Sequence, residues 1–124
     1  MNWAALASLL LALAVIIGAF GAHGLRDRLD AYSLGVYEKA VFYHFIHALG
    51  MLGVGLLHRA QALSTRDANV AGVLLGAGIL LFSGSLYALA LSGVKTLGIV
   101  TPFGGLAFIA AWVWLAIALY RHPR

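Results

Sequence analysis

Residues 70–92 of the chain read VAGVLLGAGILLFSGSLYALALS, an apolar stretch without Asp, Glu, Lys or Arg. Three more apolar stretches fill most of the remaining sequence, at residues 3–22, 36–57 and 97–120. A helix needs about 20 residues to cross a hydrocarbon layer about 30 Å thick, and each stretch is long enough. We therefore predict four transmembrane helices at about these positions, in a single domain that covers residues 1–124.

The composition supports this class of protein. Hydrophobic residues make up 63% of the chain and charged residues 10%, whereas soluble domains average about 45–50% and about 25%. The chain contains no cysteine, which excludes disulfides, thiolate metal sites and cysteine nucleophiles. The net charge of +4 is spread over the chain ends and loops. Because it forms no basic run, we expect no nucleic-acid partner.

Backbone chemistry predicts the architecture. A chain in lipid must satisfy its amides internally, so it forms helices or a closed barrel. Barrel strands alternate apolar and polar residues, whereas runs such as 79–81 are continuously apolar. The prediction is all-α: an integral membrane, up-down four-helix bundle with both termini on the same side. Residues 19–22 also resemble a signal-peptide cleavage site, although no Lys or Arg precedes the apolar run.

The loop charges leave the orientation nearly balanced. Lys and Arg favour the cytoplasmic side. Four cations fall on each side: Arg59, Arg66, Arg121 and Arg124 with the termini, and Arg26, Arg28, Lys39 and Lys95 opposite them. Lys39 falls inside the second apolar stretch, which favours cytoplasmic termini slightly.

Small residues recur at helical spacing and predict close helix packing. They are Ala14, Gly18 and Ala22 in the first stretch, Gly50 and Gly53 in the second, and Gly72, Gly76 and Gly84 in the third. Packing within the chain is the favoured interpretation, and contacts between copies are the alternative.

Two histidines fall within the second stretch. At 100° per residue, Ala40, Tyr43, His44, His47 and Met51 share one helix face. His47 lies about 16 Å from the start of this stretch, and ionisable groups at such depth usually face the bundle interior with a partner. The interpretations are a structural histidine, a proton relay or ligand contact, and a metal or haem ligand. Since a stable metal site needs more ligands than two, we predict no metal and no cofactor.

Chain direction places most intramembrane polar residues in the half of the bilayer away from the termini. This candidate polar cluster comprises His23, Tyr43, His44, His47, Ser83, Ser85, Tyr87 and Thr101. It is either a ligand site or a set of interhelical hydrogen bonds, each worth about 0.6 kcal/mol.

A helix break is predicted at Pro102, because proline removes a backbone donor and clashes with the preceding turn. Either the fourth helix kinks there, or Thr101 caps a helix that starts at Pro102. Gly104 and Gly105 follow and let a neighbouring helix approach closely.

Four motifs carry a family resemblance. They are FGAHG at 20–24, Tyr43-x-x-x-His47-Ala48-Leu49, LFSGSLY at 81–87 and TPFGG at 101–105. They resemble the motifs of the YgdD-like family of small bacterial inner-membrane proteins, to which a small eukaryotic transmembrane protein is also similar. The resemblance covers nearly the whole chain and implies a four-helix protein of the inner (plasma) membrane with cytoplasmic termini. It implies no activity, substrate or cofactor, and it implies Gln where this chain has His44.

Three classes of function remain. A packing or assembly protein, acting as an accessory subunit, a homo-oligomer or part of a larger membrane complex, is favoured and predicts mutually satisfied polar groups that no cavity reaches. A carrier, channel or small-ligand binder predicts a water-accessible cavity lined by Tyr43, His47 and Ser83. A membrane enzyme is disfavoured because no acidic residue falls near the Ser and His side chains, so no catalytic residue is predicted. Membrane lipid is an expected partner in every case.

Overall fold

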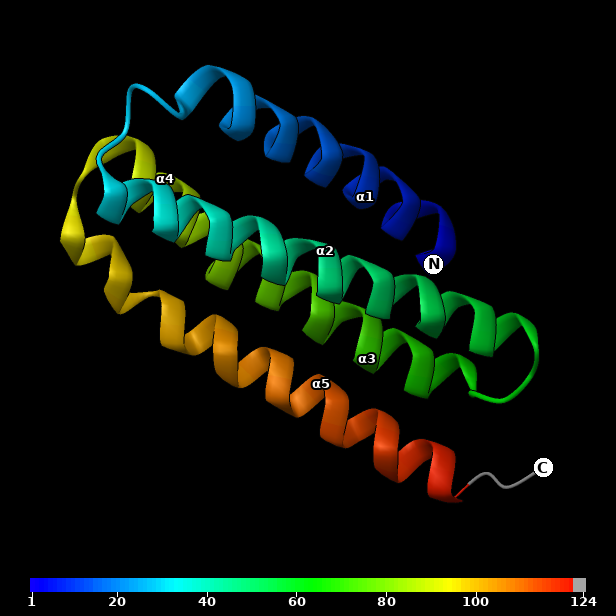
Figure 1. The fold of residues 1–124 in the computed structure, drawn as a ribbon. Coiled ribbons are helices and arrows are strands. Elements are labelled where there is room, and N and C mark those ends of the chain that lie inside the picture. The colour runs from blue at the N-terminus through cyan, green and yellow to red at the C-terminus, as the bar shows by residue number, and fades with distance from the viewer. Residues whose placement is uncertain (122–124) are drawn as a thin grey trace.

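The computed structural model describes residues 1–121 and contains, within them, four helical segments long and apolar enough to cross a membrane (Figure 1). Helix α1 (Trp3–Phe20) continues through the π-helical turn η1 (Gly21–Leu25), and α2 (Ala31–Arg59) forms the second segment. The third segment joins α3 (Thr65–Gly78), the π-helical turn η2 (Ile79–Ser83) and α4 (Gly84–Ser92). A short 3-10 helix, η3 (Lys95–Ile99), precedes α5 (Thr101–Arg121).

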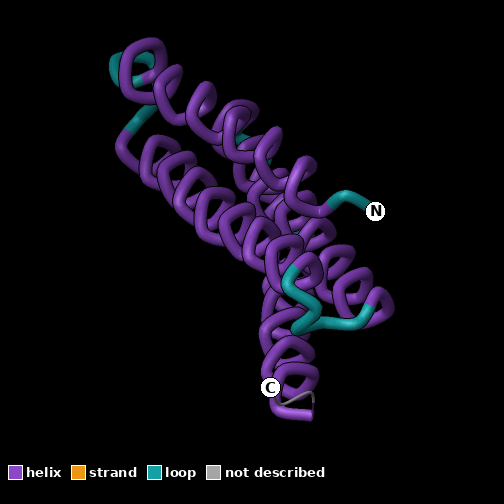
Figure 2. Tube along the Cα trace, turned by 90° about the vertical axis from the view of Figure 1, so that its right-hand side faces the viewer, coloured by secondary structure: helices purple, strands orange, loops and turns teal. Residues whose placement is uncertain are grey.

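This architecture confirms the predicted all-helical bundle of four spans. The N-terminus and the described C-terminal end lie at the same end of the bundle (Figure 1), and short loops join the helices at both ends (Figure 2). Helix α2 packs against α1 on one side and against α3 and α4 on the other, whereas α5 packs mainly against α3 and η2. Arg124, counted above among the terminal cations, lies outside the described residues.

Two helices begin earlier than hydropathy predicts because polar residues cap them. The Ser33 backbone N–H donates to Oδ1 of Asp30 at 2.7 Å, and the Asp67 N–H donates to Oγ of Ser64 at 3.0 Å. Each cap satisfies a backbone donor that the first helical turn leaves free. The same backbone hydrogen bond from Ser33 lowers the pKa of Asp30 below its ordinary value. The second and third spans therefore start at Ala31 and Thr65.

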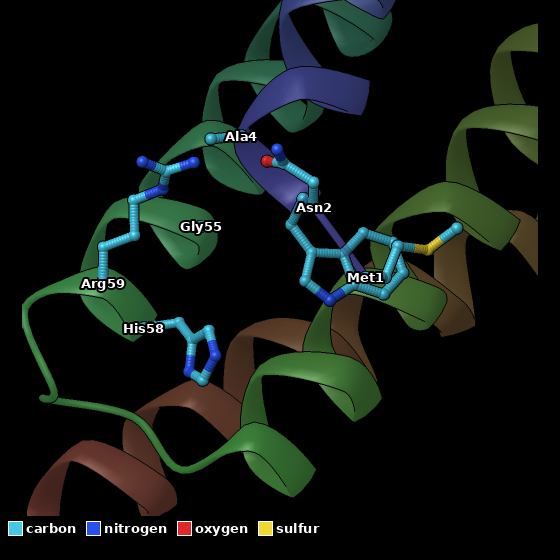
Figure 3. A pocket seen from close by; sticks show the side chains of 7 residues that line it. Met1, Asn2, Ala4, Gly55, His58 and Arg59 are labelled. Carbon is cyan, nitrogen blue, oxygen red and sulfur yellow. The ribbon is translucent and has the colours of Figure 1, made fainter.

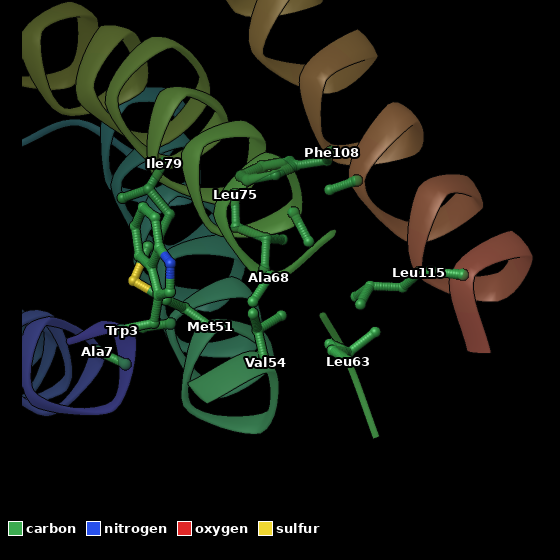
Figure 4. Close-up of a cluster of buried hydrophobic side chains, with 14 residues drawn as sticks. Trp3, Ala7, Met51, Val54, Leu63, Ala68, Leu75, Ile79, Phe108 and Leu115 are labelled. Atoms are coloured by element: carbon green, nitrogen blue, oxygen red, sulfur yellow. The ribbon is translucent and has the colours of Figure 1, made fainter. Parts of the chain in front are cut away.

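The largest core cluster lies toward the terminal half of the bundle (Figure 4). Every span contributes to it: Trp3 and Ala7 from α1, Met51 from α2, Leu75 from α3 and Phe108 from α5. Trp3 is buried and its indole Nε1 donates to Oδ1 of Asn69 at 2.9 Å, which joins α1 to α3.

The helices approach most closely where a glycine faces a neighbouring main chain. A Cβ on Gly55 would lie 2.5 Å from the Ala4 nitrogen, and one on Gly104 would lie 2.3 Å from the Phe82 nitrogen. The first pair joins α2 to α1, and the second joins α5 to the π-helical turn η2. Backbone cannot move aside as a flexible side chain can, so both positions require glycine.

Some of the predicted small residues contact a neighbouring helix, and others do not. Gly72 lies under the Trp3 ring and Gly50 under the Trp112 ring, so both serve packing within the chain. By contrast, a Cβ on Gly53 would meet no atom of residues 1–121 within 4 Å. The small-residue face of α2 is therefore uncovered at Gly53 in the single chain.

The chain at Pro102 has a helix start rather than a kink, as in the second alternative, but Thr101 is the first helical residue and not the predicted cap. Helix α5 begins at Thr101 after the separate turn η3, so Pro102 occupies its first turn, where a backbone N–H has no helical partner in any case. The Thr101 hydroxyl contacts Ser85 of α4 instead.

The close approach of α5 to η2 predicts the effect of one added methyl group. Gly104→Ala should lower the free energy of unfolding by about 1–3 kcal/mol, the usual cost of overpacking. Reversible unfolding in mixed micelles measures this change. Gly105→Ala is the matched control, because its Cβ would meet Phe82 at an ordinary 3.9 Å. Equal stability of the two variants would contradict the packing described here.

Candidate functional site

His44 joins three helices. The side chain on α2 is 2% exposed, with Nε2 2.9 Å from the Leu10 carbonyl oxygen of α1 and Nδ1 2.8 Å from the Tyr87 hydroxyl of α4. A carbonyl can only accept, so Nε2 donates to Leu10. In a neutral imidazole, Nδ1 then accepts from the Tyr87 hydroxyl. Both ring nitrogens are therefore used inside the bundle.

Two further side chains donate to a main-chain carbonyl of a neighbouring helix. The Tyr37 hydroxyl donates to Ile17 of α1 at 2.6 Å, and the Ser83 hydroxyl donates to Ala40 of α2 at 2.8 Å. Each carbonyl oxygen has two lone pairs, so it can accept this bond beside its helical one. These contacts join the helices without breaking the helical hydrogen bonds.

Ser85 and Thr101 join α4 to α5. Their hydroxyl oxygens lie 2.6 Å apart, and the Ser85 hydroxyl donates to the Phe82 carbonyl at 3.0 Å. Since Ser85 has one hydroxyl proton, the proton between the two side chains comes from Thr101. Thr101 thus anchors the start of α5 just before Pro102.

His47 has a different environment. Its Nδ1 donates to the Tyr43 carbonyl at 2.8 Å within the same helix. The ring stacks on Phe108 of α5, with centroids 3.5 Å apart and planes inclined by 12°, and Tyr43 and Trp112 complete an aromatic surround. Within residues 1–121, Nε2 has no hydrogen-bond partner and belongs to the small exposed part of the side chain. Aromatic packing therefore holds this imidazole.

A groove of about 400 Å³ lies between α1 and the α3–α4 segment. Leu10, Leu13, Ile17 and Leu80 contribute to its largely apolar lining, and His44 and Tyr87 are its polar members. We call it the α1–α4 groove. Within residues 1–121, no three His, Asp or Glu side chains are arranged to hold a metal ion.

Residues 17–105 match the family described as "Protein of unknown function (DUF423)". The chain belongs to this family. Its relatives include the UPF0382 membrane protein of Staphylococcus saprophyticus, 44% identical over 109 residues that cover 88% of each chain. The UPF0382 membrane protein YwdK of Bacillus subtilis is 45% identical over 111 residues, 89% of each chain. One from Staphylococcus epidermidis is 47% identical over 109 residues, 88% of this chain and 87% of the relative. No solved structure gives a significant match.

These matches confirm the predicted kinship with small membrane proteins of unknown function. The matched region of this DUF423 chain contains the whole polar cluster. Because the relatives are named as membrane proteins, a membrane location is shown for this chain as well.

The structure brings most of the predicted polar cluster together, but in separate pairs. His44 meets Tyr87, Ser85 meets Thr101, and Tyr43 stacks against His47, while Ser83 bonds to the α2 main chain. His23 lies apart, exposed in η1. The π-helical turn there ends the first span without turning this imidazole into the bundle.

Several contacts between helices were not predicted from the sequence. Tyr37 is 3% exposed and bonds to α1, and its spacing of seven residues from His44 could have indicated the shared face. At the terminal end, Asp67 accepts from Trp114 Nε1 at 3.2 Å and lies 3.8 Å from the Arg121 guanidinium. No spacing rule connects residues so far apart in the chain.

The three-helix contact of His44 predicts a clear order of stability. His44→Leu should lower the free energy of unfolding by about 1–2 kcal/mol, because two interhelical bonds of about 0.6 kcal/mol are lost and a hydroxyl is left unpaired. His44→Gln keeps a donor and an acceptor and should lose less. Reversible unfolding in mixed micelles provides the measurement. The exposed His23→Gln is the control, and a His44→Leu variant as stable as it would contradict this role.

Proposed function

We propose that this protein is a membrane packing or assembly protein that acts through its helix surfaces, as a homo-oligomer or as an accessory subunit of a larger membrane complex. One observation carries the proposal. Within residues 1–121, every fully buried side-chain nitrogen or oxygen already has a hydrogen-bond partner inside the chain. A polar cluster that is used in this way holds helices together and has little capacity left for a substrate.

The surface between α2 and α5 supports association with another helix. A groove of about 430 Å³ lies there, and Gly50, Gly53, Trp112 and Ala116 contribute to its lining. Small residues allow helices to approach closely in lipid, where van der Waals packing drives association. Gly53 has open space above it, so a partner helix could approach its main chain. We call this surface the α2–α5 groove.

Filling this groove should prevent association. Gly53→Leu occupies space that is empty in the single chain, so we expect the fold to persist and self-association in proteoliposomes to fall. Gly35→Leu is the matched control, because Gly35 lies on the same helix and also has no atom within 4 Å of its Cβ position. Subunit counting by single-molecule photobleaching gives the oligomeric state of each variant.

Two results would contradict the proposal. One is equal association of Gly53→Leu and Gly35→Leu, which would exclude the α2–α5 groove as the contact surface. The other is a wild-type protein that remains monomeric and also purifies without any partner protein from gently solubilised membranes.

A second candidate is a carrier or binder of a small apolar ligand. The α1–α4 groove favours it, because this groove reaches the His44–Tyr87 pair from the side of the bundle, whereas the assembly class predicted that no cavity would reach the polar cluster. Tyr43, His47 and Ser83, which the sequence predicted to line such a cavity, do not line this groove. The free Nε2 of His47 is a second point in favour of ligand or proton contact. Loss of a measured ligand or proton flux in a folded His47→Ala variant would support this candidate over assembly.

For the cell location, we propose the inner (plasma) membrane with cytoplasmic termini. Lys39 lies nine residues into α2, so it does not count among the loop cations of the side opposite the termini. The resemblance to YgdD-like inner-membrane proteins supports the same orientation, and we propose that those proteins belong to the same family.

A further inference from the structure

A second polar feature lies at the terminal end of the bundle, away from the cluster around His44. A pocket of about 300 Å³ opens between the start of α1 and the end of α2 (Figure 3). Asn2, Ala4, Gly55, His58 and Arg59 contribute to its lining. We call it the end pocket. It shares no lining residue with the α2–α5 groove, so the inference below stands apart from the proposed assembly role.

The floor of the end pocket exists because residue 55 has no side chain. The Ala4 nitrogen lies 2.5 Å from the position of a Cβ on Gly55, which brings the first turn of α1 against α2. Asn2 Oδ1 accepts from the Ala5 N–H at 3.0 Å and caps this turn. The turn adds the positive end of a helix dipole to the pocket.

Arg59 supplies the charge. Its side chain is exposed and extends past Gly55 toward the start of α1 (Figure 3). The other described Arg side chains at this end are engaged, since Arg121 pairs with Asp67 at 3.8 Å and Arg66 lies over the Trp114 ring at 5.8 Å. Arg59 has no carboxylate partner within residues 1–121. A guanidinium with free donors is suited to a phosphate, which it can bind through two parallel hydrogen bonds.

Beside the Arg59 guanidinium, the His58 imidazole contributes a ring nitrogen to the end pocket. Its Nδ1 donates to the Leu63 carbonyl at 3.2 Å, which orients the ring beside the pocket and leaves Nε2 for another contact. Among residues 1–121, no Asp or Glu lines the end pocket, so no described carboxylate there repels an anion.

Position selects among the possible anions. The second span ends at Arg59 and the first begins at Trp3, so the end pocket lies at the level where the spans leave the hydrocarbon. Lipid phosphates occupy this level, and basic pockets between transmembrane helices bind anionic head groups. We propose that the end pocket binds the phosphate of an anionic membrane lipid, with Arg59 as its main cation and the first turn of α1 as its second contact.

Native mass spectrometry of the full chain tests this site. The protein is released from micelles that contain equal amounts of phosphatidylglycerol and phosphatidylcholine, and retained lipids are counted. Wild type should retain phosphatidylglycerol preferentially. Arg59→Gln should weaken that retention about fivefold or more, the effect of removing one cation near a membrane surface. Arg66→Gln is the matched control, because Arg66 lies at the same end but outside the pocket, and it should behave as wild type.

A second variant keeps the proposal testable if Arg59→Gln fails to fold. Asn2→Asp keeps an equally good helix cap but places a negative charge in the pocket, so it should also reduce retention of phosphatidylglycerol. Circular dichroism checks that each variant remains helical. If Arg59→Gln does not fold, the outcome for Asn2→Asp decides.

Three results would overturn the proposal. Equal retention of the two lipids by wild type would show that the head group is not recognised. Equal losses in Arg59→Gln and Arg66→Gln would show a diffuse surface charge rather than a site. Displacement of phosphatidylglycerol by an equal concentration of inorganic phosphate would assign the end pocket to a soluble anion.

Discussion

The hydrogen bond from the His44 imidazole to the Leu10 carbonyl shows the constraint on which this structure depends. A polar side chain in the hydrocarbon layer has no water to bind, so its partner must come from the protein. The most abundant acceptors there are main-chain carbonyls, which can accept a second bond without leaving the helix. Tyr37 and Ser83 use the same solution at other helix contacts, and the bundle is joined through its own backbone.

The same constraint explains why helix geometry matters as much as side-chain type. A side-chain donor can reach a neighbouring carbonyl only if the two helices lie close together and in the right rotation. Glycine permits the closest approaches, where Gly55 meets the start of α1 and Gly104 meets η2. The π-helical turn η2 lies at this contact, and Ser83 at its end faces α2. Local backbone irregularity and interhelical bonding are therefore parts of one arrangement.

Because the buried polar groups are bonded within the bundle, the surfaces that can take a ligand lie on its outside. The polar atoms that could have bound a substrate mostly bind other helices, and His47 Nε2 is the exception among the histidines at the bundle centre. The open surfaces of the described residues include the α2–α5 groove, the α1–α4 groove and the basic end pocket. Each of them faces lipid or the lipid–water boundary. A partner helix, an apolar molecule and a lipid head group are the ligands that such surfaces accept.

By itself, the sequence determined the membrane class, the four spans, the position of both termini at one end of the bundle and the buried face of α2. Hydropathy and helical period are properties of the chain alone, so these features follow from the sequence. Only the tertiary structure decided that His44 meets Leu10 and Tyr87 while His23 remains exposed, and that Gly55 rather than Gly53 meets another helix. These choices follow from the rotation and crossing of helices. Many residue pairs across the bundle are compatible with the same hydropathy, and only packing selects one set.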